Sequence, residues 1–594
     1  MEESVVKLEP FESSSSESDY RDVEEENVEP IAKEQQHLED ISHLDPLVTV
    51  NTGMQKRQRK QPERYGYANI CTSVGEDGMS YAEAISGPEK QQWLQAMAEE
   101  LRSFQDNNAW EVVDRPDNIA QPYPKFKSTF KAYNDSIVCP QIKDGIFMGT
   151  LDCLRLNIFA PTSASFRNRL PIMVLIHGGG FIFGYSSRYS YGPKHLVRHD
   201  VILVTFNYRL GPYGFMCLDT PGVPGNQGLK DQLLLLRWVK AHIASFGGDV
   251  NKITLIGESS GSVCAEAHLL SKQEKLYTKL ILESGVVAKP GIIIDSDPTM
   301  PIKISERMGF KTKNVSEALS FLTKSDPKWV VTTYNEQKIT LGICIEKEFE
   351  NVESFLTEHP LNLGTPQVKE MPILAGYNNR EGLMMDALKP YDYFKKENFL
   401  RDSLEKIFNY DESFIEMEKI VHRFYFGDRE ITDDFRHRVI DFISDFYFNH
   451  PIQGTLDKLY NCGANIFQYL FSYDGGINYI KNKYKITSEG AAHGDELEYL
   501  FVLKEKTACS SNDQVMIDRM TKLWTNFAKT GDPTPHTTSL LPVKWMPITG
   551  NSTNYLNIDS ELSMDVRPFN DRLSFWELFF KANKRKLKGY RENI

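Results

Sequence analysis

The stretch KITLIGESSG at residues 252–261 decides the fold of this chain. Its first half is apolar and β-branched, which is typical of a buried strand. The residues that follow, SVCAEAHLL, continue as a helical segment. Ser259 stands between the two, and Gly257 and Gly261 on either side are small enough for a strand to turn sharply into a helix. The stretch therefore predicts a strand, a tight turn and a helix, with a serine hydroxyl on the turn.

Apolar runs of strand length alternate with helical segments on both sides of this turn. Continuous apolar strands with helices between them must be covered on both faces, which predicts an α/β fold with a mostly parallel, doubly covered sheet. The segment 285–370 is helix-rich and is expected to pack beside that sheet. The strand runs are PIMVLI, VILVTF, KLILE, MPILAGYNN and NIFQYLF, and the clearest helical segments are GLKDQLLLLRWVKAHIASF and IDRMTKLWTNFAK.

A glycine-rich motif, HGGGF at residues 177–181, follows the strand PIMVLI. Alone, such glycines could form a plain loop or a phosphate cradle. A strand, a G-x-S-x-G motif and a helix in this order form the nucleophile elbow of the α/β-hydrolases. In that fold a glycine-rich loop and the residue after the nucleophile present backbone N–H groups that stabilise the oxyanion of a tetrahedral intermediate. We therefore predict that Gly179, Gly180 and Ser260 supply an oxyanion hole next to Ser259.

A nucleophilic serine needs a histidine base and a carboxylate that orients it. In this fold the three follow one another as serine, acid and histidine. Glu381 comes just after the strand MPILAGYNN, and His493 stands in GAAHGDEL, beyond the strand NIFQYLF. Carboxyl ends of parallel strands are where open α/β sheets build their sites, so Glu381 and His493 are the predicted acid and base. No H-E-x-x-H motif occurs, and we expect neither a metal nor a cofactor.

Charge is distributed unevenly along the 594 residues, whose net charge is -13. The first 50 residues hold 15 acidic and 3 basic side chains, which leaves 66 acidic against 65 basic in the rest. The near-neutral body excludes a basic nucleic-acid binder, and no apolar run is long enough to span a membrane. Residues 1–60 are expected to be a disordered acidic linker. The opening MEESVVKLEP lacks the pattern of a signal peptide, so the sequence as written predicts a cytoplasmic protein.

Eight cysteines are too few for a disulfide scaffold, and none forms a C-x-x-C pair. Cys139 and Cys153, 14 residues apart, are the candidate disulfide. The alternative, that all eight are reduced thiols, stays open.

Ordered motifs from residue 137 onward resemble the type-B carboxylesterases of the carboxylesterase and cholinesterase family, and insect esterases in particular. The resemblance implies an α/β-hydrolase domain over residues 117–585. It also implies a serine carboxylic ester hydrolase that works through an acyl-enzyme, with Ser259 as nucleophile, His493 as base and Glu381 as acid. The substrate would be a small apolar ester, and members of the family are often secreted. The motifs are IVCPQ, DCLRLNIFAP, HGGGFIFG, NYRLGPYGF, GESSG, NNREG, GAAHGDELEYLF and LWTNFAKTGDPTP.

Glu258 bears on specificity, because juvenile hormone esterases usually have glutamine there. The resemblance at this position therefore favours a general carboxylesterase.

The opening of the chain departs from that family. Pro62–Tyr65 (PERY), SYAEAISGP, W-x-x-A-M-x-x-E and NNAWEVVDRP resemble the start of the reverse transcriptase of copia-type retrotransposons, over residues 61–116. A helix near residues 86–104 and a strand at 110–113 are expected in this fragment, which has no catalytic group. It stands where the family has its own first strands, so the hydrolase is expected to be N-terminally truncated, with exposed edge strands.

Two alternatives to an active esterase stay open, the first because of this departure and the second because the family also includes non-catalytic members. One is a truncated, transposon-fused esterase without stable activity, and the other is a non-catalytic, cholinesterase-like binding protein. The sequence does not decide the oligomeric state.

Overall fold

The computed structural model describes residues 67–72 and 135–590, apart from 338, 364–367, 390–392, 395–398 and 504–508. The acidic linker 1–60 and the helix and strand predicted near residues 86–104 and 110–113 lie outside the described residues.

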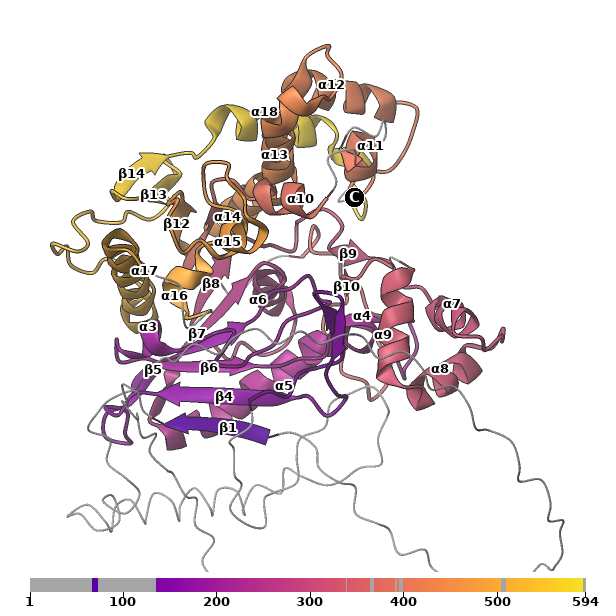
Figure 1. Cartoon of the computed structure of the whole chain (residues 1–594), viewed down its shortest axis with the longest axis horizontal. Helices are drawn as coiled ribbons and strands as arrows, with labels where there is room; N and C mark the ends of the chain where they lie inside the picture. Colours follow the sequence, from indigo (N-terminus) through magenta and orange to yellow (C-terminus); the bar gives the residue numbers. More distant parts are fainter. Residues whose placement is uncertain are drawn as a thin grey trace, which may run out of the picture. The chain divides into compact units, whose positions relative to one another are not determined.

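A sheet of ten strands forms the centre of the described chain (Figure 1). Seven neighbouring pairs in it are parallel, while β4–β6 and β13–β14 are antiparallel. The predicted α/β fold with a mostly parallel sheet is confirmed. In spatial order the strands are β1 (Tyr67–Thr72), β4 (Arg155–Ala160), β6 (Ile202–Phe206), β5 (Leu170–Ile176), β7 (Gly248–Glu258), β8 (Lys279–Glu283), β11 (Pro372–Asn378), β12 (Asn465–Phe471), β13 (Asn554–Ile558) and β14 (Ser563–Val566).

The apolar core lies on both faces of this sheet. Successive side chains of a strand point to opposite faces, so in β5 Ile172, Val174 and Ile176 join one cluster while Met173 and Leu175 join the other. Helices α5 (Gln227–His242) and α6 (Ser260–Leu270) contribute to the first cluster, and α3 (Lys194–Val197) and α17 (Ser511–Thr530) to the second. Cover on both faces explains why the central strands are apolar throughout.

The remaining elements surround the sheet. The segment after β8 lies beside the sheet, on the right of Figure 1. It contains α7 (Met300–Arg307), α8 (Val315–Lys324), α9 (Pro327–Glu336) and the strand pair β9 (Ile293–Ile294) and β10 (Ile343–Cys344). The others are the hairpin β2 (Gln141–Lys143) and β3 (Ile146–Met148), α4 (Gly211–Phe215), α10 (Gly382–Leu388), α11 (Phe399–Leu404), α12 (Phe414–Phe426), α13 (Arg436–Ser444), α14 (His450–Asn461), α15 (Tyr479–Tyr484), α16 (Leu497–Leu500) and α18 (Asn570–Ala582).

One edge of the sheet differs from expectation. We expected the departure from the family at the N-terminus to leave edge strands exposed, but β4 is paired along its length with β1 in parallel register, from Tyr67 opposite Arg155 to Thr72 opposite Ala160. The expectation is wrong for β4 because the run YANICT supplies a strand that satisfies its backbone groups. A short stretch of the segment assigned to the retrotransposon-like fragment is therefore part of the hydrolase sheet.

Two disulfide bonds cross-link the described chain. One joins Cys139 to Cys153, and the other joins Cys217 to Cys344 over a separation of 127 residues. The second was not predicted, because nothing along the sequence relates two cysteines so far apart.

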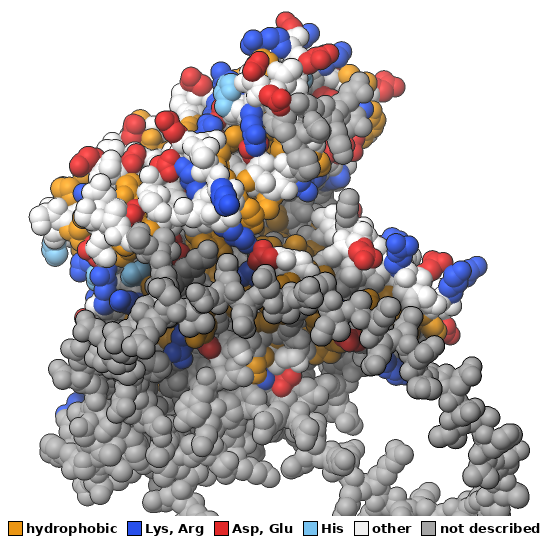
Figure 2. Space-filling view, in the orientation of Figure 1, with side chains coloured by type: hydrophobic (Ala, Val, Ile, Leu, Met, Phe, Trp, Pro, Cys, Tyr) orange, Lys and Arg blue, Asp and Glu red, His pale blue; other side chains and the backbone are white. Residues whose placement is uncertain are grey.

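The surface agrees with the balanced charge of the body. On the face seen in Figure 2, acidic and basic side chains are interspersed among neutral and apolar ones over the coloured part. Among the helices that the structure describes, none has both the length and the apolar character needed to cross a membrane.

Candidate active site

Ser259 is the single residue between β7 and α6, and its backbone is strained. Its φ of 54° and ψ of -123° are rarely adopted by a non-glycine residue and typically cost about 1–3 kcal/mol. The two flanking glycines have no room for a side chain. A Cβ on Gly257 would lie 2.1 Å from the carbonyl oxygen of Gly261, and a Cβ on Gly261 would lie 2.1 Å from that of Ile176. The predicted sharp turn is present, and it lifts the serine hydroxyl away from the strand.

A chain of hydrogen bonds connects Ser259, His493 and Glu381. The Nε2 atom of His493 lies 2.8 Å from Ser259 Oγ, and its Nδ1 atom lies 2.6 Å from Glu381 Oε2. Because an ionised carboxylate only accepts hydrogen bonds, Nδ1 carries the ring proton and Nε2 accepts the hydroxyl proton of Ser259. The structure thus brings together three residues that are far apart in the sequence, since His493 is 112 positions from Glu381 and 234 from Ser259.

The second carboxylate oxygen of Glu381 is fixed by two further hydrogen bonds. Its Oε1 atom accepts a hydrogen bond of 2.6 Å from the hydroxyl of Ser284 and one of 2.8 Å from the backbone N–H of Asn378. Ser284 follows β8 directly and has a φ of 54°. With both oxygens bonded and the side chain buried, this carboxylate has a fixed direction toward His493.

The glycine motif lies against the elbow. A Cβ on Gly178 would meet Glu258 Oε2 at 2.5 Å and Ser259 Cβ at 3.2 Å, so the two loops are in contact. Gly179 and Gly180 have φ of 115° and 62°, and no described carbonyl accepts a hydrogen bond from either backbone N–H. Ser260 is the first residue of α6, where N–H groups lack a partner within the helix. Gly179, Gly180 and Ser260 therefore offer free donors beside Ser259.

His177 braces this motif. Its ring stacks on that of Tyr208 at 4.5 Å, and Tyr208 donates a hydrogen bond of 2.8 Å to the His177 carbonyl. Burial lowers the pKa of His177 to about 4, so the ring is neutral near pH 7. The histidine is thus a structural support for the glycine loop.

Further buried carboxyl groups interact with Glu258 and Glu381, the two carboxyl groups that contact His493. Glu258 Oε1 lies 3.4 Å from His493 Nε2, and burial raises the pKa of Glu258 to about 7. Burial raises the pKa of Glu283 to about 8, although Trp524 donates a hydrogen bond to it. Burial also raises the pKa of Glu496 well above its usual range. Of these three groups, Glu258 is the one in contact with the base, so its ionisation changes the charge beside His493.

Sequence reasoning missed Ser284, Glu283, Glu496 and Asn378, and it considered Glu258 only for specificity and not for its contact with the base. Glu258 is inside the G-x-S-x-G motif, and Glu283 and Ser284 end a central strand, so their positions at carboxyl ends of strands are a signal that could have found them. Asn378 and Glu496 bond each other at 2.5 Å across 118 residues, a contact that no local pattern indicates.

Metal ligands are not grouped in the described part of the chain, where no three His, Cys, Asp or Glu side chains are arranged to hold an ion. His195 and His199 are four residues apart, but His199 Nε2 lies 3.0 Å from the hydroxyl of Thr521. The prediction that no metal or cofactor takes part stays a prediction.

The sequence profile of the Carboxylesterase family matches residues 118–576. This chain belongs to the carboxylesterase family. Human bile salt-activated lipase (Homo sapiens) is 30% identical over 490 residues, which cover 78% of this chain and 64% of the human protein. This chain thus spans less than two thirds of the human protein. Juvenile hormone esterase of Heliothis virescens is 28% identical over 496 residues, which cover 76% of this chain and 84% of that protein.

The fold has a solved counterpart. A crystal structure of juvenile hormone esterase from Manduca sexta, with OTFP covalently attached, matches with a TM-score of 0.69 and 25% sequence identity. The match covers 78% of this chain and 92% of the Manduca chain. The α/β-hydrolase fold predicted from the sequence is confirmed by this match.

Proposed function

We propose that this carboxylesterase hydrolyses carboxylic esters through a Ser259–His493–Glu381 triad. The observation that carries the proposal is the continuous hydrogen-bonded chain from Ser259 Oγ through both ring nitrogens of His493 to Glu381. A serine is a weak nucleophile unless an adjacent base takes its proton. This chain places such a base within hydrogen-bonding distance and orients it by a carboxylate.

The reaction runs in two steps. His493 Nε2 takes the proton of Ser259 as Oγ attacks the ester carbonyl, and the resulting oxyanion is bound by the N–H groups of Gly179, Gly180 and Ser260. The tetrahedral intermediate collapses, the C–O bond breaks, and the alcohol leaves with the proton from His493. A water molecule, deprotonated by the same histidine, then hydrolyses the acyl-serine and restores the enzyme.

The substrate class is a small apolar ester, with a broad carboxylesterase specificity. Phe448 packs against His493 with ring centroids 4.8 Å apart. Ile182 and Phe183, the second and third residues after Gly180, are partly exposed. Relatives of this chain are named a bile salt-activated lipase, a pyrethroid hydrolase and a juvenile hormone esterase. Apolar side chains around the base fit apolar acyl and alcohol groups.

Hydrolysis of p-nitrophenyl acetate, butyrate and octanoate tests the function. The full chain should release p-nitrophenol with all three esters, and Ser259→Ala should reduce kcat to the background rate. Ser262→Ala, which changes a serine of the helix that follows Ser259, is the matched control and should retain activity. A folded wild-type chain without hydrolysis of any ester would instead support a non-catalytic binding protein or an inactive truncated esterase.

The origin of residues 61–116 stays a prediction. The family match begins at residue 118 and covers none of this segment. Sequencing a single transcript across residues 116–130 separates a true fusion with a copia-type element from two neighbouring genes joined in error.

The cytoplasmic location also stays a prediction. The two disulfide bonds bear against it, because disulfides persist mainly in oxidising compartments. Counting free thiols in acid-quenched protein from its source separates the two cases. Eight alkylated cysteines fit the cytoplasm, whereas protection of Cys139, Cys153, Cys217 and Cys344 fits an oxidising compartment.

A further inference from the structure

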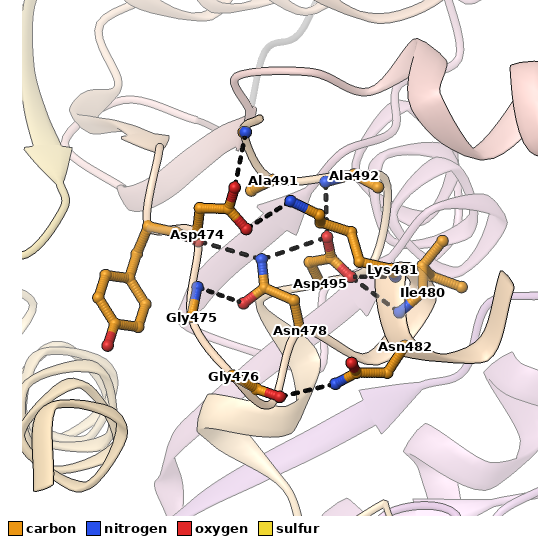
Figure 3. Close-up of polar contacts among 12 residues, drawn as sticks. Asp474, Gly475, Gly476, Asn478, Ile480, Lys481, Asn482, Ala491, Ala492 and Asp495 are labelled. Atoms are coloured by element: carbon orange, nitrogen blue, oxygen red, sulfur yellow. Dashed lines mark hydrogen bonds and ion pairs between the residues drawn. The ribbon is translucent and has the colours of Figure 1, made fainter. Parts of the chain in front are cut away.

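The loop that carries His493 folds around one buried carboxylate. Figure 3 shows Asp495 at the centre of a polar network that includes Asp474, Asn478 and Lys481. Its Oδ1 atom accepts hydrogen bonds from the backbone N–H groups of Ile480 at 2.8 Å and Lys481 at 3.1 Å. These two N–H groups belong to the first turn of α15, so one oxygen of Asp495 is committed to that helix.

The second oxygen of Asp495 reaches the residue before the base. Oδ2 accepts a hydrogen bond of 2.6 Å from the backbone N–H of Ala492 and one of 3.3 Å from Asn478 Nδ2. The backbone N–H of Asp495 in turn donates to the carbonyl of Ala492 at 3.1 Å. His493 is therefore enclosed in a tight turn whose two ends, Ala492 and Asp495, bond each other twice.

We propose that Asp495 is a positioning residue for His493, because its carboxylate joins Ala492 to the first turn of α15 and so fixes where the imidazole stands. This inference rests on the proposed function, in which His493 is the base. Asp495 acts through the backbone.

The rest of the network supports the same segment. Asp474 accepts a hydrogen bond of 3.1 Å from the backbone N–H of Gly490 and forms an ion pair of 2.5 Å with Lys481. On the opposite side, the carbonyl of Ala492 accepts a hydrogen bond of 2.8 Å from Asn378, and the N–H of Ala491 donates one of 2.8 Å to Asn379. These asparagines precede Glu381, so the base is held between the acid's own loop and Asp495.

A carboxylate is suited to this position because each oxygen accepts two hydrogen bonds. An asparagine of the same shape has one acceptor oxygen and a donor NH₂ group. Its NH₂ group would therefore point at the N–H donors that one of the two carboxylate oxygens now binds, and those hydrogen bonds would be lost. The variant Asp495→Asn should therefore remove the hydrogen bonds of one oxygen with almost no change in side-chain volume. A displacement of the base by about 1 Å can reduce catalysis on the order of 100-fold.

The test compares Asp495→Asn with Asp513→Asn in the full chain, with p-nitrophenyl butyrate as substrate. Asp513 is also buried and bonds the other end of the same loop, where Oδ1 accepts from the N–H of Gly476 at 3.1 Å, and it caps α17 through Ser510. No hydrogen bond joins Asp513 to residues 490–493 among those described. Both variants should lower Tm, which controls for general loosening.

Asp495→Asn should lower kcat roughly 10- to 100-fold while KM changes less than about threefold. The rate of labelling by a fluorophosphonate should fall by the same factor, whereas Asp513→Asn should keep kcat within about threefold of wild type. Asp474→Ala removes a half-exposed carboxylate, so it remains measurable even if Asp495→Asn does not fold, and its kcat should fall roughly two- to fivefold.

Two results would overturn the positioning role. One is a wild-type kcat in folded Asp495→Asn or, if that variant does not fold, in Asp474→Ala. The other is an equal loss of kcat in Asp513→Asn. A wild-type chain that hydrolyses no ester contradicts the proposed function itself, and is thereby distinguished from a failure of this inference alone.

Discussion

Between β7 and α6 the chain turns on Ser259 alone, whereas residues 472–492 separate the end of β12 from His493. The elbow is fixed by sterics within five residues, because Gly257 and Gly261 leave no space for a Cβ. The histidine loop is fixed by hydrogen bonds that reach Asp495, Asp474 and the asparagines before Glu381. One half of the site is thus specified locally and the other half by tertiary contacts.

This difference matters for how each half fails. The elbow has no space for one more atom at Gly257 or Gly261, so a single added methyl group should displace the whole turn. A network of several hydrogen bonds loses one bond at a time, so its variants should show graded effects. Substitutions in the two halves of the site should therefore differ in how much activity they remove.

Removal of the base should have the largest effect. We expect His493→Gln to reduce kcat for p-nitrophenyl butyrate on the order of 10⁵- to 10⁶-fold, because serine loses its proton acceptor. The measurement is steady-state kinetics, with circular dichroism to verify the fold. His422→Gln, at a histidine on the exterior of α12, is the matched control and should keep full activity. Residual activity above about 1% in His493→Gln would remove the histidine from the mechanism.

A methyl group on the elbow should come next. The new Cβ of Gly257→Ala would lie 2.1 Å from the carbonyl oxygen of Gly261, so the turn must shift and kcat should fall at least about 100-fold. Gly454→Ala is the matched control, because it is exposed in α14 with no atom within 4 Å of its added Cβ. That control should keep kcat and stabilise the protein by up to about 1 kcal/mol. A normal kcat in Gly257→Ala would contradict the steric account of the elbow.

Loss of the charge beside the base should have a smaller, pH-dependent effect. Burial raises the pKa of Glu258 to about 7, so the group is ionised above that pH and neutral below it. Its negative charge, 3.4 Å from His493, favours the imidazolium that forms during the reaction. Glu258→Gln should lower kcat roughly tenfold at pH 8, equivalent to about 1.4 kcal/mol, and by less at pH 6. An equal loss at both pH values would contradict this electrostatic role.

Removal of a distant cross-link should leave catalysis unchanged. The Cys217–Cys344 bond closes 127 residues, and its loss through Cys217→Ser with Cys344→Ser should lower the free energy of unfolding by about 5 kcal/mol. The Cys139–Cys153 bond closes 14 residues, so its removal should cost about 3 kcal/mol. Denaturant unfolding of oxidised protein measures both, and kcat per titrated active site should stay within about twofold. A change in kcat with unchanged stability would contradict this separation.

The parts of the molecule that the sequence predicts are those whose cause is local. The stretch 252–261 contains its own strand, turn and helix, and the apolar runs mark the central strands because both faces of the sheet are covered. The positions of Glu381 and His493 also follow from strand ends and chain order. What could not be predicted depends on distant partners, as with Ser284 on Glu381, Asp495 on Ala492, and the bond between Cys217 and Cys344.

The pairing of β1 with β4 illustrates the same limit. YANICT has the composition of a strand, but its partner lies more than 80 residues away, and nothing in the run indicates which sheet edge it joins. Strand-forming tendency is a local property, whereas pairing and register are settled by the rest of the fold.

Covalent labelling of Ser259 tests the central claim most directly. The full chain would be incubated with a fluorophosphonate, and the modified residue would be identified by peptide mass spectrometry. We predict one phosphonate per chain, on Ser259, with none on Ser259→Ala and with labelling slowed on His493→Gln. A cooperatively unfolding wild-type chain that stays unlabelled, or that is labelled on another residue, would contradict the account.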